Sequence, residues 1–415
     1  MSKNVRILCD LTQSWSETGG GIRTYLTEKR DWLTRHTPHR HILIVPGDAD
    51  RVTEDGRHIT VEIESPRVPG SPMYRLLLRN RSVIRALRYH QPGVVECLDA
   101  YNLPWAALAY RKERPNTVLV AGYRTDFPEV YLDAPLRKRL GGWAGAPLGK
   151  LGYRYAARLY RKFDGMYALG RPMADKLANL TGNPVDVLPL GVDTKVFSPA
   201  ARDPELRAAF GVGHEDPLLV YAGRLDGEKQ GDVILNAFAE LPRDMKAGLV
   251  LLGIGNLLDE LRDFARERNL NAHFPGFVSG RADLARHLAS ADLYVSAMAH
   301  ETFGISIIEA QSCGLPVIGV RAGAMPDRVS PDLGRLGPVG DASAMAASIR
   351  SVWESGKAIP MAAAARKHVE DNFSWDRTFD HLFGTIYAQA SRSSLQRRGL
   401  DVQGDNTLSL MEVQA

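Results

Sequence analysis

Two carboxylates lie eight positions apart in the segment HETFGISIIEAQSCGLPVIGV, residues 300–320. Glu301 is in a short polar stretch, whereas Glu309 follows Ile307 and Ile308 in an apolar run that predicts a helix. Because a buried charge without a partner is costly, Glu309 needs either a ligand or a route to solvent. A carboxylate in this position could accept hydrogen bonds from both hydroxyls of a ribose, and Glu301 could meet the hydroxyls of a sugar.

Two cations lie five positions apart in YAGRLDGEKQGD, residues 221–232, which follows a predicted strand. Ligands bind at the carboxyl ends of strands in open parallel sheets, so Arg224 and Lys229 are placed to meet one. Arginine offers a fork of donors and lysine a point charge, and together they could hold a diphosphate. The alternative is an exposed loop in which Lys229 pairs with Asp226 or Glu228.

Glycines mark further predicted strand-to-helix turns. In TGGGIRTYL, residues 18–26, Gly20 and Gly21 would let the backbone approach an anion at a helix N-terminus. Their spacing differs from the dinucleotide pattern G-x-G-x-x-G, so it does not indicate NAD. The other turns of this kind contain Gly253, Gly255 and Gly304.

An aromatic residue follows a short predicted strand in FPGFV, residues 274–278. The side chain of Phe277 is expected in the core, while the backbone of Phe277 and Val278 could pair with the edge of a base. The motifs of the second half thus lie at successive strand ends and converge on one crevice. Their combined chemistry fits a ligand with a diphosphate, a ribose and a polyhydroxylated group, which is a nucleotide sugar.

Short apolar runs alternate with helix-length segments, and this alternation predicts an α/β fold of parallel, doubly wound sheets. The predicted strands are Val5–Leu11, His41–Pro46, Ile59–Ile63, Val94–Leu98, Val118–Tyr123, Gly165–Leu169, Val185–Leu188, Leu218–Ala222, Gly248–Gly253, Ala272–Phe274, Leu293–Ser296, Val317–Val320 and Gly334–Pro338. The predicted helices are Ile22–Thr34, Tyr74–Tyr89, Leu148–Phe163, Val233–Glu240, Leu257–Glu267, Ala282–Ser290, Ile305–Cys313 and Ala342–Glu354. The segment 189–217, rich in Pro, Gly and Asp, predicts a linker between two domains.

The composition is that of a globular protein: 44% of the 415 residues are apolar and 24% are charged. We find no run of about 18 apolar residues, so we expect no transmembrane helix. The N-terminus does not have the layout of a signal peptide. The three cysteines, Cys9, Cys97 and Cys313, lie in apolar contexts without metal-type spacing. They predict buried free thiols in a reducing compartment, the cytoplasm.

Two basic runs without Asp or Glu lie in the N-terminal half, at residues 67–88 and 137–162. The arginines of the first run alternate with leucines and predict an amphipathic helix with a basic face, Arg75 and Arg79 included. Such a face could lie on an anionic membrane surface, at the inner face of the cell membrane, or receive a phosphorylated substrate. A solvated helix face is the alternative. Aromatic-interleaved basic motifs and zinc signatures are lacking, which argues against a nucleic-acid partner.

These motifs resemble those of the retaining GT-B glycosyltransferases of family 4, also called group 1. The resemblance covers roughly residues 4–390 and includes, besides the pairs Arg224/Lys229 and Glu301/Glu309, the stretches DVLPLGVDTKVFSP and FSWDRTFDHLF. It implies two Rossmann-like doubly wound domains that face a cleft. The implied boundaries are 1–195 for an acceptor-binding domain, 196–375 for a nucleotide-sugar-binding domain, 376–390 for a helix that crosses back, and 391–415 for a disordered tail.

The resemblance also implies roles for single residues. The diphosphate would lie against Arg224 and Lys229, the ribose against Glu309 and the donor sugar against Glu301. Arg224, Lys229 and Glu301 are the implied catalytic residues, acting by position and charge. The implied donor-binding set also contains Gly20, Gly21, Gly253, Gly255, Phe277, Val278, Phe303, Gly304 and Ile305. No metal and no cofactor would be needed, because helix dipoles and the two cations neutralise the leaving diphosphate.

The implied reaction moves a hexose from a GDP- or UDP-sugar, such as GDP-mannose or UDP-glucose, to a lipid-linked or glycan acceptor with an α linkage. A soluble small-molecule acceptor, a sugar-nucleotide epimerase and a non-catalytic subunit are the alternatives. One segment departs from the family pattern: Arg124 stands in YRTDFP, residues 123–128, where many relatives carry His. Arg124 and Asp126 are therefore candidates to face the acceptor or the sugar. Three interpretations are open. The change from His to Arg is simply tolerated, or Arg124 pairs with Asp126, or Arg124 meets an anion, such as the carboxylate of UDP-glucuronate or a phosphate on the acceptor.

Overall fold

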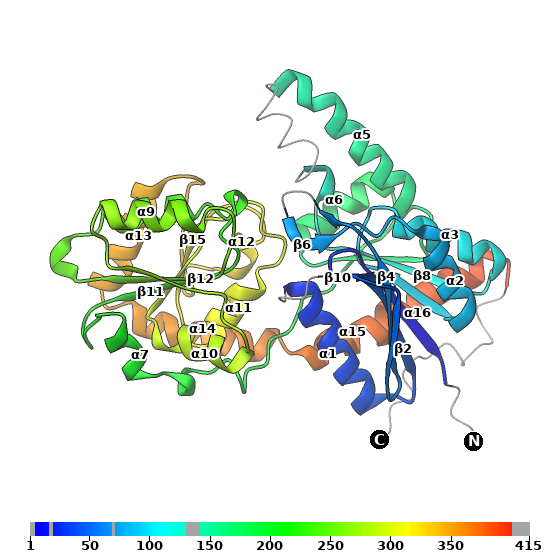
Figure 1. The fold of residues 1–415 in the computed structure, drawn as a ribbon, viewed down its shortest axis with the longest axis horizontal. Coiled ribbons are helices and arrows are strands. Elements are labelled where there is room, and N and C mark those ends of the chain that lie inside the picture. Colours follow the sequence, from blue (N-terminus) through cyan, green and yellow to red (C-terminus); the bar gives the residue numbers. More distant parts are fainter. Residues whose placement is uncertain (1–4, 16–19, 69–70, 130–141, 401–415) are drawn as a thin grey trace. The chain divides into compact units, whose positions relative to one another are not determined.

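The computed structural model describes residues 5–15, 20–68, 71–129 and 142–400 (Figure 1). The chain divides into two compact units. Unit 1 comprises residues 1–189 and 376–415, and unit 2 comprises residues 190–375. The residues after 375 therefore belong to the same unit as the N-terminus, and the expected linker segment begins at the division between the units.

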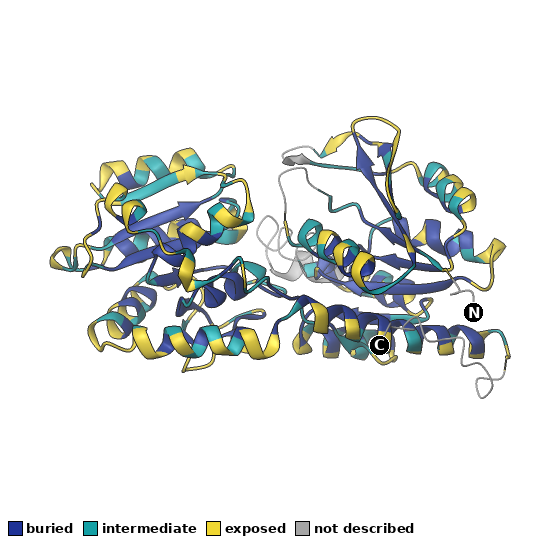
Figure 2. Ribbon diagram, turned by 90° about the horizontal axis from the view of Figure 1, so that it is seen from below, coloured by how far each residue is buried: buried dark blue, intermediate teal, exposed yellow. Residues whose placement is uncertain are grey.

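Unit 1 is built on an eight-stranded sheet with one antiparallel strand pair at its edge. Its strands are β1 (Ile7–Leu11), β2 (Arg40–Gly47), β3 (Arg51–Asp55), β4 (His58–Glu64), β7 (Val94–Cys97), β8 (Val118–Tyr123), β9 (Gly165–Ala168) and β10 (Asp186–Val187). They lie in the order β10-β9-β8-β7-β1-β2-β4-β3, and all neighbours except β3 and β4 are parallel. The central strands are mostly apolar and are buried on both faces, as is usual for parallel strands covered by helices (Figure 2).

The helices of unit 1 cover both faces of this sheet. They are α1 (Gly21–His36), α2 (Asn80–His90), α3 (Leu103–Glu113), α5 (Gly142–Tyr160), α6 (Arg171–Thr181), α15 (Trp375–His381), the π-helical η5 (Leu382–Ile386) and α16 (Tyr387–Arg397). The ring of Trp32 on α1 stacks on Phe383, with 4.8 Å between centroids. On β9, a Cβ added to Gly165 would lie 2.8 Å from the Cβ of Ala390. The C-terminal helices therefore complete the core of unit 1.

Two predictions in unit 1 are wrong. The predicted helix Tyr74–Tyr89 is shorter, because β6 (Ser71–Arg75) forms a hairpin with β5 (Arg67–Val68) before α2 begins at Asn80. The tail expected to be disordered from residue 391 continues α16 to Arg397. Its small polar side chains can be buried against the sheet: Ser391 and Ser394 are 2% and 1% exposed. Residues 401–415 lie outside the described residues.

Unit 2 contains a second sheet of six parallel strands, in the order β13-β12-β11-β14-β15-β16. The strands are β11 (Leu218–Ala222), β12 (Gly248–Leu252), β13 (Ala272–Gly276), β14 (Leu293–Val295), β15 (Val317–Val320) and β16 (Gly334–Gly337). Its helices are η2 (Pro199–Ala201), α7 (Pro204–Ala209), η3 (Gly227–Lys229), α8 (Gly231–Ala239), η4 (Arg243–Met245), α9 (Leu258–Glu267), α10 (Arg281–Ser290), α11 (Ile305–Ser312), α12 (Met325–Arg328), α13 (Ala342–Glu354) and α14 (Ala358–Asn372). The prediction of doubly wound parallel sheets is confirmed.

The strand order of unit 2 reverses at β11, which has β12 on one side and β14 on the other. At such a reversal the loops that follow two adjacent strands diverge and leave a crevice for ligands. The loops after β11 and β14 are those that carry Arg224, Lys229 and Glu301. In the described part of the chain, no helix is both long and apolar enough to span a membrane.

Candidate functional site

The ammonium group of Lys229 and the carboxylate of Glu301 meet at the carboxyl edge of the unit 2 sheet. Lys229 Nζ lies 3.8 Å from Glu301 Oε2 and 2.7 Å from Met298 Sδ. Both charged side chains are about one-fifth exposed, at 19% and 18%. The two sequence motifs therefore converge at the point where the strand order reverses, and both charges remain accessible to a ligand.

Backbone amides hold Glu301 in place. Its Oε1 atom accepts hydrogen bonds from the amides of Thr302 (3.2 Å) and Gly304 (3.1 Å). Gly304 has φ +80° and directly precedes α11, so the chain turns there in a conformation that favours glycine. Gly323 comes close from the next loop, where a Cβ would lie 2.5 Å from the carbonyl oxygen of Glu301. These contacts fix one carboxylate oxygen and leave the other beside Lys229.

Glu309 lies on α11 and is 9% exposed. Its carboxylate has no hydrogen-bond partner among the residues that the structure describes. Burial raises the pKa of Glu309 to about 7, and the positive charge of Arg281 only partly offsets this effect. The side chain is thus largely buried and has no partner in the described structure, which is the arrangement expected of a group that a ligand satisfies.

Arg224 is held by two acidic neighbours. Its terminal nitrogens donate to the carboxylates of Asp226 and Glu228, and the three side chains are between 25% and 38% exposed. The sequence offered Lys229 as the partner of these acids, but the structure gives them to Arg224. Any anion that binds Arg224 must therefore compete with two carboxylates for the guanidinium group.

Two glycines set the distance between neighbouring loops. A Cβ on Gly253 would lie 1.9 Å from the carbonyl oxygen of Gly223, and one on Gly255 would lie 2.3 Å from the carbonyl carbon of Leu225. Leu225 also accepts a hydrogen bond from Leu257 N at 3.0 Å. The glycines after β12 therefore let this loop pack against the loop that carries Arg224.

The aromatic candidates have different environments. Phe277 is 49% exposed, so the expectation that its side chain is a core residue is wrong. The strand β13 ends at Gly276, with φ +85°, and the next residues leave the sheet. Val278 is half-buried.

Phe303 is 2% exposed, and the Cζ atom of Arg328 lies 4.3 Å from the centroid of its ring. Phe303 therefore anchors the loop of Glu301 to the core of unit 2. Ile305, at the start of α11, is half-buried.

Hydrogen bonds of one tyrosine link β11, β14 and α11, and the sequence analysis did not predict them. The hydroxyl group of Tyr294, on β14, donates to the carbonyl oxygen of Ala222 at 3.1 Å and lies 2.9 Å from Ser306 Oγ. This link joins the end of the strand before Arg224 to the first turn of the helix of Glu309. A tyrosine within an otherwise aliphatic buried strand is the signal that could have identified it.

Unit 1 contains a buried cluster of charges that the sequence analysis also missed. Lys29 Nζ lies 2.7 Å from Asp10 Oδ1, 2.8 Å from Glu96 Oε2 and 2.9 Å from the hydroxyl of Tyr387. The charged side chains are fully buried. Burial lowers the pKa of Lys29, but the carboxylates of Asp10 and Glu96 outweigh it and raise the pKa above its ordinary value. Charged residues inside the strand sequences RILCDL and VVECL are the signal for this cluster.

The cluster extends toward the loop after β8. Glu96 Oε1 accepts hydrogen bonds from the hydroxyls of Tyr25 (3.0 Å) and Tyr167 (2.5 Å). Arg124 Nη1 donates to the hydroxyl of Tyr167 at 3.3 Å, and Arg124 is 5% exposed. Asp126 accepts from Tyr123 at 2.8 Å and from Lys176. Among the described residues Arg124 and Asp126 do not pair with one another.

The glycine turn of unit 1 follows β1. Asp99, after β7, accepts hydrogen bonds from Thr12 Oγ1 (2.7 Å) and Gln13 N (2.5 Å) and so anchors the start of this loop. Gly20 has φ +114° and precedes α1, which begins at Gly21. Residues 16–19, between these anchors, lie outside the described residues.

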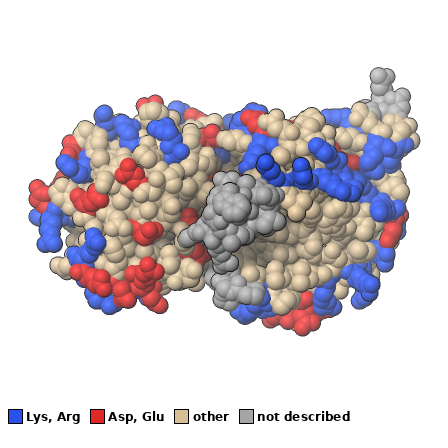
Figure 3. All heavy atoms as spheres, turned by 90° about the horizontal axis from the view of Figure 1, so that it is seen from above, with Lys and Arg blue, Asp and Glu red and all other residues tan. Residues whose placement is uncertain are grey.

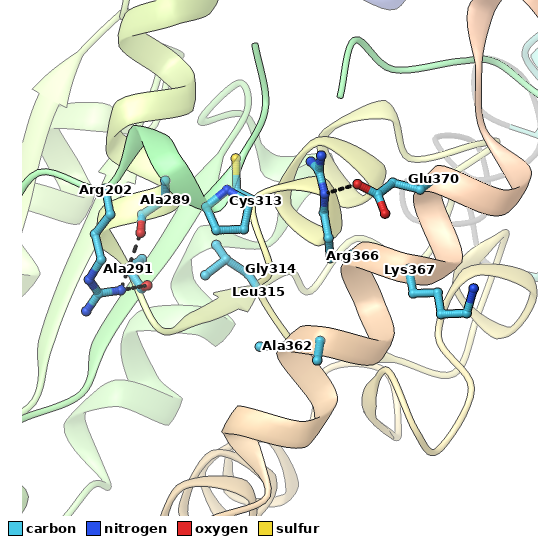
Figure 4. Close-up of a pocket in the computed structure, with 12 residues that line it drawn as sticks. Arg202, Ala289, Ala291, Cys313, Gly314, Leu315, Ala362, Arg366, Lys367 and Glu370 are labelled. Atoms are coloured by element: carbon cyan, nitrogen blue, oxygen red, sulfur yellow. Dashed lines mark hydrogen bonds and ion pairs between the residues drawn. The ribbon is translucent and has the colours of Figure 1, made fainter. Parts of the chain in front are cut away.

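A cavity of about 460 Å³ lies elsewhere in unit 2 (Figure 4). Its lining includes Ala291 and Leu315, which come just before β14 and β15, together with Cys313 and Arg366. It is thus at the amino edge of the sheet, opposite the loops that carry Glu301 and Arg224. Arg366 is already bound by Glu370 and by backbone carbonyl oxygens. This cavity is therefore separate from the candidate site.

The basic runs of unit 1 differ in how far their charges are paired. Figure 3 shows how Lys and Arg side chains are distributed over one face of the molecule. In the first run, Arg79 pairs with Asp50 and Arg88 with Glu113. In the second, three cations lie four residues apart along α5, are exposed and have no ion-pair partner within the described ranges. They are Lys150, Arg154 and Arg158. Residues 137–139 lie outside the described residues.

The described residues contain no group of three or more His, Cys, Asp or Glu side chains that could hold a metal ion.

Two family models match the chain: "Glycosyl transferases group 1" over residues 202–368, and "Glycosyltransferase Family 4" over residues 19–196. Among characterised proteins, the chain is 26% identical over 362 residues to a GDP-mannose-dependent alpha-(1-6)-phosphatidylinositol dimannoside mannosyltransferase of Mycobacterium tuberculosis. This match covers 85% of the chain and 88% of the relative.

Two solved structures share the fold. Sucrose-phosphate synthase from Thermosynechococcus elongatus superposes with a TM-score of 0.74 at 19% identity, over 92% of this chain and 98% of that chain. Anabaena HepE, in complex with UDP-glucose, superposes with a TM-score of 0.70 at 19% identity, over 92% and 99% of the two chains.

Proposed function

Because the chain belongs to the group 1 glycosyltransferases of family 4 and has the GT-B fold, we propose that it is a retaining hexosyltransferase. The donor is a GDP- or UDP-sugar, and the acceptor is a lipid-linked or glycan hydroxyl that receives an α linkage. Glycosyltransferase activity follows from the family, while retention, donor and acceptor are the proposed parts.

Glu309 carries the proposal for the donor. A carboxylate that is nine-tenths buried and unpartnered in the described structure can accept from the two hydroxyls of a ribose. Arg224 and Lys229, on the loop after β11, supply the positive charge for a diphosphate. The backbone of Phe277 and Val278, just after the end of β13, would pair with the base.

The chemistry assigned to these groups is electrostatic. The glycosidic bond to the diphosphate breaks, and Arg224 and Lys229 stabilise the charge that develops on the leaving oxygen. The departing phosphate takes the proton of the acceptor hydroxyl, which attacks from the same face of the sugar. Glu301, held by two amides, orients the sugar hydroxyls and forms no covalent bond.

The donor is tested by hydrolysis without an acceptor. The purified full-length chain is incubated with GDP-mannose, UDP-glucose, UDP-N-acetylglucosamine and UDP-glucuronate, and the released nucleotide is measured. Slow release from one donor, with retained configuration of the freed sugar by NMR, is the expected result. Arg224→Ala should abolish this release. Turnover that survives in Arg224→Ala, or an inverted product, would contradict the assignment, and full turnover in Glu301→Ala would remove Glu301 from the mechanism.

GDP-mannose is our first choice of donor, because the relative with 26% identity depends on it. UDP-glucose is the second, since Anabaena HepE binds it in its crystal structure. The name of the mannosyltransferase relative also contains a glycolipid, phosphatidylinositol dimannoside, and this supports a lipid-linked acceptor for the present chain.

The cations on α5 support a membrane-bound acceptor. Like charges four residues apart destabilise a helix, so three in a row favour an anionic partner surface. Sedimentation with vesicles of phosphatidylglycerol, compared with phosphatidylcholine, tests this at low and high salt. The triple variant Lys150→Gln, Arg154→Gln, Arg158→Gln should lose the binding, whereas the control triple Arg40→Gln, Lys112→Gln, Arg114→Gln should keep it. Equal binding by both variants would favour a soluble acceptor.

A further inference from the structure

The ammonium group of Lys229 makes one hydrogen bond within the described part of the chain, and its acceptor is a sulfur atom. Lys229 Nζ lies 2.7 Å from Met298 Sδ. Its charged neighbour, Glu301 Oε2, is 3.8 Å away, which is an ion-pair distance and too long for a hydrogen bond. A lysine ammonium has three N–H donors and a thioether is a weak acceptor. Most of the hydrogen-bonding capacity of Lys229 is therefore available to a ligand.

The two cations of the loop after β11 are held in different ways. Arg224 donates to the carboxylates of Asp226 and Glu228, which are strong, charged acceptors. Lys229 has no carboxylate at hydrogen-bond distance among the described residues, and Glu301 has one of its oxygens turned to two backbone amides. The sulfur atom is thus the contact that gives the ammonium group a direction.

The sulfur contact joins two loops of unit 2. Lys229 is the last residue of η3, in the loop after β11, and Met298 is the third residue after the end of β14. These are the adjacent strands at which the strand order reverses. Met298 is 8% exposed, as a methionine that fills a gap in a core would be. Its sulfur nevertheless lies against a cation that is 19% exposed, where an aliphatic side chain would offer no acceptor.

A fixed direction matters for a lysine because its side chain has several rotatable bonds. The backbone of Lys229 is fixed by the hydrogen bond from its amide to the carbonyl oxygen of Asp226, at 2.9 Å, but this leaves the ammonium group free to move. A group that is oriented before the ligand arrives loses less entropy on binding. A carboxylate could orient it too, but would offset the charge that a phosphate needs. A thioether is neutral and leaves that charge intact.

We propose that Met298 is a positioning residue for the donor phosphates: its sulfur takes one N–H donor of Lys229 and so directs the ammonium group, while the other two donors remain for phosphate oxygens. This inference rests on the proposed function and deepens it, because the sequence motifs gave Met298 no role. Met298 itself touches no reacting atom in this arrangement and acts through Lys229.

A double-mutant cycle with the full-length protein tests this role. GDP and UDP are titrated into the wild type, Met298→Leu, Lys229→Ala and the variant with both changes. Leucine nearly conserves the volume of methionine and removes the sulfur. Met298→Leu should weaken binding of the preferred nucleotide by about two- to fivefold, as expected for one modest hydrogen bond, and should have no effect once Lys229 is Ala. Met361→Leu, at a core position of unit 2 that is 5% exposed, is the matched control and should bind as the wild type does.

The other outcomes of the cycle contradict the proposal. Equal weakening by Met298→Leu with and without Lys229 would give Met298 a structural role only. Unchanged binding would mean that Lys229 is oriented without the sulfur, and stronger binding would mean that the sulfur competes with the ligand. A wild type that binds neither GDP nor UDP would refute the proposed function and, with it, the role of Met298.

Methyl NMR gives a second readout that needs no change at Met298. In protein with isotope-labelled methionine methyl groups, addition of the nucleotide that binds should shift one methionine resonance. Lys229→Ala should shift the same resonance in the protein without a nucleotide. If no methionine resonance responds to Lys229→Ala, the sulfur does not contact the ammonium group and the proposal fails. This measurement decides the matter even if Met298→Leu does not fold.

Discussion

Asp10 and Glu96 lie opposite one another in the register of β1 and β7, and both accept a hydrogen bond from the single ammonium group of Lys29. Two negative charges in neighbouring buried strands repel each other, so the cation between them holds this part of the sheet together. The hydroxyl of Tyr387 reaches the same ammonium group from the C-terminal helix. The cluster thus joins the first strand of the chain to one of its last helices.

Lys29→Met should strongly destabilise unit 1. Removing one partner from a buried ion cluster leaves uncompensated charge and costs about 3–5 kcal/mol. Urea unfolding followed by circular dichroism should show this loss in the free energy of unfolding. Lys112→Met, on an exposed position of α3, is the matched control and should change it by less than about 0.5 kcal/mol. A small effect of Lys29→Met would mean that water or rearrangement neutralises Asp10 and Glu96.

Tyr387→Phe should weaken the attachment of α16 to the sheet. The hydroxyl donates to Glu96 and accepts from Lys29, so both partners lose a hydrogen bond that involves a charge. We expect a loss of about 1.5–3 kcal/mol in the free energy of unfolding. Hydrogen exchange should show faster opening of α16 in this variant. Tyr89→Phe, at a position that is 80% exposed, should leave stability and exchange unchanged.

The alternation of apolar runs was enough to predict most of the fold, because buried parallel strands are short, aliphatic and bounded by turns. Val118–Tyr123 and Val317–Val320 are identical in the prediction and in the structure. The hairpin of β5 and β6 could not be predicted in this way, since it is only a few residues long and consists partly of Arg and Pro. The prediction of disorder from residue 391 was wrong for a related reason: the serines there are polar, but they are small enough to be buried.

The candidate site was predictable only as far as chemistry follows from residue type and position. Strand ends placed Lys229 and Glu301 at one edge, and the structure brings them together. The partners of Arg224 could not be predicted, because the sequence allows Asp226 and Glu228 to pair with either Arg224 or Lys229. The cluster around Glu96 was missed for a physical reason. A charged residue in a strand can face solvent or a buried partner, and here one partner, Tyr387, comes from the far end of the chain.

Glu228→Gln should increase the affinity for a nucleoside diphosphate. Glu228 pairs with Arg224 and competes with a diphosphate for the guanidinium group. Pairs this exposed contribute about 0.2–1 kcal/mol, so affinity should rise by roughly 1.5- to 5-fold. Titration with GDP and UDP measures this, and Asp259→Asn, at an exposed position of α9, is the control. Weaker binding in Glu228→Gln would indicate that Glu228 positions Arg224 rather than competing for it.

Donor affinity should depend on pH through Glu309. In the protein without a nucleotide, burial raises the pKa of Glu309 to about 7, so the carboxyl group is largely protonated at pH 6. Only the ionised carboxylate can accept hydrogen bonds from both ribose hydroxyls, so binding must release a proton below this pKa. The affinity for GDP or UDP should fall by up to about tenfold for each pH unit below 7 and level off above it. Glu309→Gln should bind more weakly at pH 8 and lose this dependence.

The same pKa makes an opposite prediction for stability, and the two together identify Glu309. Its folded-state pKa of about 7 is above the ordinary carboxyl value of 4.5, so the folded state holds the proton more tightly than the unfolded state. The contribution to stability is therefore complete below about pH 4.5 and is lost as the pH rises through 7. Unfolding of the wild type between pH 5 and 8 should show this loss, about 3 kcal/mol at most, and Glu309→Gln should not. A pH profile shared by both proteins would assign the titration to another group, whereas affinity that rises while stability falls over the same range would locate it at Glu309.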